Sequence, residues 1–119
     1  MNWKLDKNRP ICPQIVEQIS VKIARGELQP EERLLSVREV ALEAGVNPNT
    51  VQKSFEQLEQ SGLIYSIRGS GWYVGDQADA AKKIVGELVR KKTEAYFNEM
   101  ELLGYGDDQT KDYVKEWEK

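Results

Sequence analysis

The chain has 119 residues, of which 39% are hydrophobic and 31% are charged, and its net charge of −3 argues against a general nucleic-acid coat without excluding a local basic patch. It has no histidine and a single cysteine, Cys12, which excludes intrachain disulfides, the usual zinc sets, Ser-His-Asp triads and Cys-His pairs, so we expect no enzyme, cofactor or metal site. No apolar run approaches the roughly 18 to 20 residues of a membrane helix and the first residues lack a secretory signal, which predicts a cytoplasmic protein without membrane contact.

The first half of the chain predicts three helices separated by short breaks. Isoleucines at steps of four over residues 13–25 form one face of an amphipathic helix. Ser36 stands three residues before Glu39 in a capping box, which opens a short helix that Gly45 closes. Asn47 is the expected N-cap of a third helix, with proline at its first position. The predicted helices span residues 13–25, 37–44 and 48–61, and their expected core residues are Ile15, Ile19, Val40, Val51, Phe55 and Leu58.

A β-hairpin and two further helices are predicted in the second half. Residues 63–67 and 72–74 are rich in β-branched and aromatic side chains, and residues 68–71 between them supply the glycines of a tight turn. The chain then reads as helical from residue 76 to residue 103, and Asp107 is the expected cap of a last short helix.

Helix, helix-turn-helix and hairpin is the element order of a winged helix. Basic and acidic residues number nine each in residues 1–75 but eight and eleven in residues 76–119, so the whole charge deficit lies in the second segment. We predict an α+β, mainly α fold: an N-terminal winged helix-turn-helix DNA-binding domain over residues 1–75, and a short two-helix C-terminal dimerisation arm over residues 76–119.

The strongest chemical signal is the exposed start of the third helix. Its side chains are short or flexible hydrogen-bonding groups beside free backbone N–H groups, which attract phosphate. Asparagine and glutamine can pair with adenine in the major groove, and lysine can meet guanine or phosphate. The alternative is a simple N-cap followed by a solvated face. The candidate DNA-binding residues of this helix are Asn47, Asn49, Thr50, Gln52 and Lys53.

The hairpin turn offers a second contact with DNA. Arg68 lies beside Gly69, so the backbone can approach a sugar-phosphate edge while the guanidinium enters the minor groove or clamps a phosphate. An ordinary exposed turn is the alternative. Tyr65, Trp72 and Tyr73 could stack on bases, but aromatic residues in a hairpin that packs on helices are more often core, and we predict a structural role for them.

Four stretches, taken in order, resemble the GntR family of bacterial transcription regulators. They are residues 34–41 (LLSVREVA), 45–53 (GVNPNTVQK), 58–65 (LEQSGLIY) and 68–71 (RGSG), within a match that runs from residue 8 to residue 75. The C-terminal region, with LLGY at residues 102–105 before the last helix, resembles the YtrA-type subfamily, which has a dimerisation arm instead of a large effector domain.

The resemblance implies which residues touch operator DNA. They are Arg38 on the second helix, Asn47, Asn49, Thr50 and Gln52 on the recognition helix, and Arg68 with Gly69 in the wing. The chain departs from the family pattern at three positions. Glu31 stands where the family usually has glycine, Leu35 where it usually has proline, and Pro48 where many relatives have arginine.

The long helix predicted from residue 76 carries an apolar stripe too wide for one short helix to cover. It either packs back onto the winged helix or meets a second copy across a two-fold axis, and we favour the homodimer. The candidate dimerisation residues are Ile84, Leu88, Tyr96, Met100, Leu103 and Trp117.

We therefore predict a sequence-specific DNA-binding regulator, a repressor, that binds a pseudo-palindromic operator as a homodimer. The subfamily resemblance suggests control of transporter genes and names no effector. The alternative is a winged-helix protein-interaction module without specific DNA binding, which the charge balance of residues 1–75 keeps open.

Overall fold

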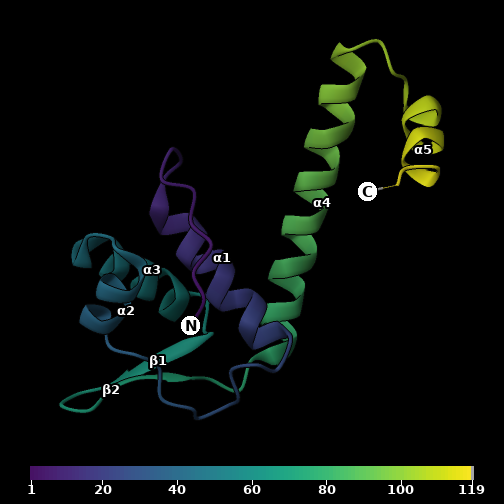
Figure 1. Cartoon of the computed structure of the whole chain (residues 1–119). Coiled ribbons are helices and arrows are strands. Elements are labelled where there is room, and N and C mark those ends of the chain that lie inside the picture. The colour runs from purple at the N-terminus through teal and green to yellow at the C-terminus, as the bar shows by residue number, and fades with distance from the viewer. Residues whose placement is uncertain (119) are drawn as a thin grey trace. The chain divides into compact units, whose positions relative to one another are not determined.

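The computed structural model describes residues 1–118 and divides the chain into two compact units, Met1–Val85 and Gly86–Lys119. The elements follow the predicted order (Figure 1). They are α1 (Ile11–Ala24), α2 (Val37–Ala44), α3 (Pro48–Gln60), β1 (Ile64–Ile67), β2 (Gly71–Val74), α4 (Ala78–Leu102) and α5 (Asp107–Lys115). The predicted α+β, mainly α architecture with an N-terminal winged helix is confirmed.

The core of the N-terminal unit lies where α1, α2 and α3 meet the hairpin. All six predicted core residues are buried there, joined by apolar residues of the strands. Trp72 packs edge-on against Phe55 with their ring centroids 5.5 Å apart, and Tyr65 stacks on Tyr73 at 5.8 Å. The hairpin aromatics therefore have packing partners within the unit.

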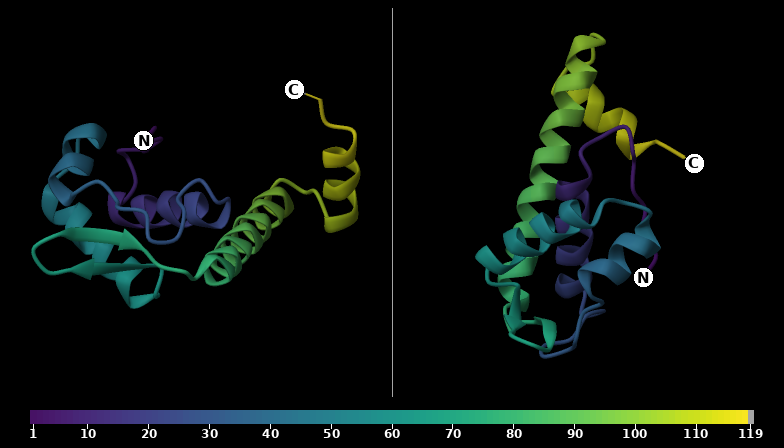
Figure 2. Two further views of the ribbon diagram at one scale, coloured as in Figure 1. Left: turned by 90° about the horizontal axis from the view of Figure 1, so that it is seen from below. Right: turned by 90° about the vertical axis from the view of Figure 1, so that its left-hand side faces the viewer.

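The hairpin is antiparallel, with Tyr65 opposite Tyr73, and its turn extends away from the helices (Figure 2). The loop before α2 pairs with β2 through an isolated β-bridge, which the sequence did not predict. Arg33 forms a bridge with Tyr73, and the amide of Leu34 donates to the carbonyl of Trp72 at 2.9 Å. The paired residues are far apart in the sequence, so no local pattern of residues 27–35 predicts this pairing.

The N-terminal unit extends ten residues beyond the boundary that we predicted after residue 75. Ala81 on the first turns of α4 is fully buried in the core, and Ile84 packs against the same cluster. The beginning of the long helix thus belongs to the winged helix by packing, although it is continuous with the arm.

The C-terminal unit contains the rest of α4 and the short helix α5. The prediction that Asp107 caps α5 is wrong by one position: Gly106 is the N-cap and makes no side-chain cap bond, while Asp107 lies in the first turn. Its carboxylate there still favours the positive end of the helix dipole. Several large apolar side chains of this unit are exposed, namely Val89, Tyr96, Leu102, Leu103, Tyr113, Val114 and Trp117.

Candidate nucleic-acid interface

The second helix begins with the capping box that the sequence predicts. The hydroxyl of Ser36 accepts from the amide of Glu39 at 3.1 Å, and the Glu39 carboxylate accepts from the amide of Ser36 at 3.0 Å. This return bond to the backbone, with the Ser36 hydroxyl second, lowers the pKa of Glu39 below 4.5. The cap fixes the first turn of α2, from which Arg38 projects into solvent.

The turn between α2 and α3 is held from two sides. Gly45 ends α2 in a left-handed conformation, with φ 68°, which glycine adopts without steric cost. Asn47 caps α3 as predicted, and its side-chain oxygen accepts from the amide of Asn49 at 2.8 Å. The sequence did not predict the second support, in which the Lys7 ammonium donates to the carbonyl of Gly45 at 3.1 Å. A cation is favourable at this helix C-terminus.

The outer face of α3 carries the predicted readout residues. Asn49 and Lys53 are exposed on it, while Thr50 is half-buried. Gln52 is also half-buried, and its amide donates to the carboxylate of Glu56 one turn later at 3.2 Å. A base that pairs with Gln52 therefore has to compete with this intrahelical hydrogen bond.

The turn of the hairpin presents the wing residues. Arg68 and Gly69 are exposed at its tip, and Gly69 has a φ of 80° with open space around its Cα. Arg33, in the loop before α2, supports this tip: its guanidinium donates to the carbonyl of Ser70 at 2.7 Å and lies beside Gly71. Gly71 has a φ of 142°, a conformation that residues with a side chain rarely adopt, and an added Cβ would lie 3.3 Å from Nε of Arg33.

Three basic groups of this unit are available to a polyanion. Within residues 1–118, Arg38, Lys53 and Arg68 form no ion pair or side-chain hydrogen bond. They come from α2, α3 and the wing, which are the elements that a winged helix applies to DNA. Such guanidinium and ammonium groups can replace the counterions of a phosphate backbone without first breaking an ion pair within the protein.

The candidate dimerisation residues are spread over both units. Ile84 packs on the winged-helix core, whereas Leu88 and Met100 are half-buried on α4. Tyr96, Leu103 and Trp117 are exposed in the C-terminal unit.

Among residues 1–118, no three or more possible metal-ligating side chains lie close enough together to hold a metal ion. No helix in this part of the chain is both long enough and apolar enough to cross a bilayer.

A family model described as bacterial regulatory proteins, gntR family, matches residues 13–74, which include every predicted DNA-binding residue. The chain belongs to the GntR family. It is 31% identical to the HTH-type transcriptional regulator YhcF of Bacillus subtilis over 97% of this chain and 95% of that protein. It is 41% identical to the transcriptional repressor YtrA of Bacillus subtilis over 58% of this chain and 53% of YtrA. The relatives are transcriptional regulators, a family without enzymatic activity.

Solved structures of GntR regulators have the same fold. A GntR family transcriptional regulator from Listeria monocytogenes superposes with a TM-score of 0.81 at 33% identity, over 96% of this chain and all of that one. The DNA-binding domain of AraR in complex with operator ORE1 superposes with a TM-score of 0.54 at 28% identity, over 63% of this chain and 94% of that one. The winged-helix region of this GntR protein is therefore similar to a domain solved on DNA.

One departure from the family pattern has a structural outcome. Glu31, where the resemblance leads us to expect glycine, adopts a φ of 70°, the left-handed conformation that glycine tolerates best. The loop thus keeps a glycine-like backbone, held by the amide of Glu31, which donates to the carbonyl of Val74 at 2.7 Å. The Glu31 carboxylate also accepts from the hydroxyl of Tyr65, and this bond raises the pKa of the tyrosine above 10.0.

Proposed function

We propose that this GntR protein is a sequence-specific transcriptional repressor that binds a pseudo-palindromic operator as a homodimer. The observation that carries the proposal is that Arg38, Lys53 and Arg68 form no ion pair within residues 1–118 and lie on the three elements that a winged helix applies to DNA. Similarity to an AraR domain in complex with its operator supports the same role. The protein would act in the cytoplasm, where its operator is.

Base readout is assigned to the start of α3. Asn49 and Lys53 project from its outer face, and Gln52 lies beside them. The bond between the amide of Asn49 and the side chain of Asn47 fixes the first turn before DNA arrives, so little conformational entropy is lost there on binding. Thr50 completes this group, whereas Arg38, Arg68 and Gly69 are assigned to phosphate and groove-edge contacts.

Binding-site selection tests the DNA part of the proposal. The full-length protein is incubated with random-sequence duplexes, the bound duplexes are enriched, and the affinity for the enriched sequence is measured at two salt concentrations. We expect two inverted half-sites, about one helical turn or a multiple apart, bound on the order of a thousandfold more tightly than unrelated DNA. No enriched sequence, with weak and uniform binding, would favour a protein-interaction module, which the nine basic and nine acidic residues of residues 1–75 also fit.

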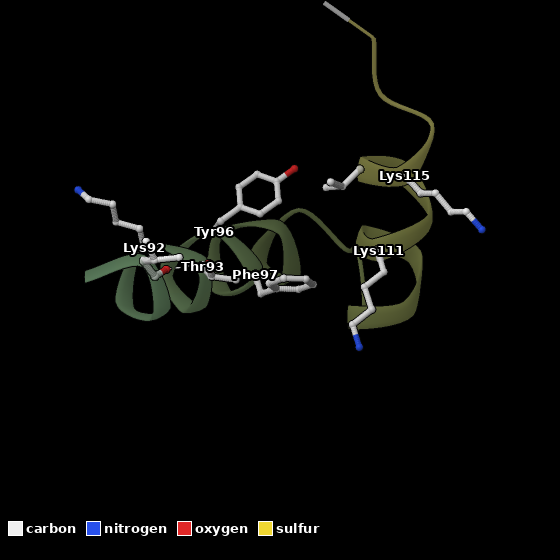
Figure 3. Close-up of a pocket in the computed structure, with 8 residues that line it drawn as sticks. Lys92, Thr93, Tyr96, Phe97, Lys111 and Lys115 are labelled. Atoms are coloured by element: carbon white, nitrogen blue, oxygen red, sulfur yellow. Dashed lines mark hydrogen bonds between the residues drawn. The ribbon is translucent and has the colours of Figure 1, made fainter. Parts of the chain in front are cut away.

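The dimer part rests on the exposed apolar residues of the C-terminal unit. Tyr96 is 38% exposed, Val114 is 49% exposed and Trp117 is 55% exposed, and these three side chains line one hollow, an apolar surface of the kind that marks interfaces in small proteins. Tyr96 points from α4 toward α5 (Figure 3). Sedimentation of the full-length protein at micromolar concentration should give twice the chain mass. A monomer there would contradict the proposal.

We also propose that the protein controls transporter genes that lie beside its own gene. This step rests on the subfamily resemblance alone. Transcript levels of the neighbouring genes in a strain lacking this protein test that step. Repression predicts higher transcript levels in the deletion strain than in the parent.

A further inference from the structure

The chain ahead of α1 folds back along that helix and reaches the end of α2 (Figure 1). Residues 3–7 of this segment precede the stretch that the gntR family model matches, residues 13–74. Two of its side chains bond to the last turn of α2 and to the residue that ends this helix. The segment therefore contacts the helix-turn-helix although it lies outside the family match.

Two glutamines of α1 hold the backbone of this segment. The side chain of Gln14 accepts from the amide of Asp6 at 2.7 Å and donates to the carbonyl of the same residue at 2.9 Å. One turn later, the side chain of Gln18 accepts from the amide of Lys4 at 3.1 Å and donates to its carbonyl at 2.7 Å. Four residues advance a helix by about 6 Å, which is close to the span of two residues of extended chain. Both pairs of bonds therefore form together and hold the segment in one register, antiparallel to α1.

The side chains of residues 3 and 7, at the two ends of this register, reach α2. The indole Nε1 of Trp3 donates to the carboxylate of Glu43 in the last turn of α2 at 3.2 Å, and Trp3 packs against the core. The ammonium of Lys7 donates to the carbonyl of Gly45 at 3.1 Å, and a Cβ added to Gly45 would lie 3.3 Å from that ammonium. The segment thus places Lys7 directly against the residue that ends α2.

The bond from Lys7 holds one peptide group in the turn between α2 and α3. The carbonyl of Gly45 and the amide of Val46 belong to the same planar peptide. The amide of Val46 donates to the carbonyl of Ala41 at 3.1 Å, while the carbonyl of Gly45 accepts from Lys7. This peptide cannot rotate without breaking one of the two bonds, and the next residue, Asn47, is the N-cap of α3. The direction in which α3 leaves the turn therefore depends on it.

Resting on the proposed operator binding, we infer that Lys7 is a positioning residue for DNA recognition: by holding the peptide between Gly45 and Val46, it sets α3 against α2 before DNA is bound. Contacts with DNA are assigned to both helices, to Arg38 on α2 and to Asn49 on α3, and both form together only when the two helices keep one mutual orientation. A turn that is already ordered loses less conformational entropy on binding. Lys7 acts through the turn and not through a phosphate.

Replacement of Lys7 in the full-length protein tests this role. Lys7→Met keeps the aliphatic stem and removes the donor. The bond lies at the surface, so we expect roughly a threefold loss per chain, which multiplies to about a tenfold higher operator dissociation constant for two chains. Lys7→Arg, which keeps a cationic donor, should stay within about threefold of the wild type. Lys83→Met, the matched control, removes the same charge from an exposed position on α4 and should stay within about twofold.

The salt dependence separates positioning from a phosphate contact. A positioning residue changes the affinity without releasing counterions, so the slope of log affinity against log salt for Lys7→Met should equal that of the wild type. A slope smaller by about 1.8, for two lost phosphate contacts, would make Lys7 a DNA contact and overturn the inference. Equal operator affinities for Lys7→Met and the wild type would also overturn it, and a lower urea midpoint would then assign Lys7 to general stability.

Amide hydrogen exchange of the protein without DNA tests the turn directly. In Lys7→Met the amides of Val46 and Asn49 should exchange on the order of threefold faster than in the wild type, whereas the amide of Ile19 in α1 should be unchanged. Unchanged exchange at Val46 would overturn the positioning role. A wild-type protein that selects no DNA sequence would remove the proposed function, while the exchange at Val46 still decides whether Lys7 orders the turn.

Discussion

Replacing Arg68 with alanine should lower the salt dependence of operator binding by an amount that the structure sets. Each chain has one wing, and its exposed Arg68 has no ion-pair partner within the described residues, so the side chain is free to neutralise one phosphate. A homodimer carries two wings. Because each phosphate contact contributes about 0.9 to the slope of log affinity against log salt, the variant should lose about 1.8 from that slope.

The difference between the two slopes gives a change in the ratio of wild-type to variant affinity that a binding assay can measure. Between 50 and 200 mM salt, a slope difference of about 1.8 means that the advantage of the wild type over Arg68→Ala shrinks about twelvefold. Fluorescence anisotropy with a labelled operator duplex at four or five salt concentrations measures both slopes. The discrimination between operator and point-mutated operators should remain, because a phosphate contact carries no sequence information.

Arg25→Ala is the matched control for this measurement. It removes the same charge from the C-terminal end of α1, which lies at the far end of the N-terminal unit from the wing (Figures 1 and 2), where Arg25 has Glu27 at 3.7 Å. Its slope should equal that of the wild type. An unchanged slope for Arg68→Ala would refute the phosphate contact, and a loss of discrimination at one base pair would mean that the wing reads a base.

Four further predictions concern stability and base readout. Glu31→Gly should be more stable than Glu31→Ala by about 1 kcal/mol in urea unfolding, because glycine alone accepts a φ of 70° without strain, and the reverse order would contradict the left-handed loop. Ser36→Ala should lower the free energy of unfolding by about 1 kcal/mol through loss of the cap, and an unchanged midpoint would argue against it. Since the folded-state pKa of Glu39 is lowered, its stabilising contribution is present above pH 4.5 and is lost as the pH falls through the folded-state value, so Glu39→Gln should flatten the acid limb of the stability profile. Gln52→Ala should reduce discrimination at one base pair of the operator by about 1 to 3 kcal/mol, and an unaltered profile would assign Gln52 to helix positioning.

Local sequence patterns were enough to predict the helices, the turn between α2 and α3, and the polar outer face of α3. The capping box at Ser36 and Glu39 and the N-cap at Asn47 are interactions within one turn, so the residues that form them are neighbours in the chain and their spacing predicts them. The buried face of α3 follows from the helical period, and that period also places Asn49 on the opposite, outer face.

The bonds that support these elements join residues that are far apart in the chain. Lys7 donates to Gly45 across 38 positions of the chain, and Arg33 donates to Ser70 across 37, so neither bond leaves a periodic or capping signal in the sequence. Ala81 shows the same limit for the unit boundary. The apolar stripe of the long helix continues through it without a break, and burial in the core of the N-terminal unit assigns it to the winged helix rather than to the arm. Local propensity and period act over a few residues, whereas these supports depend on which distant segments the fold brings into contact.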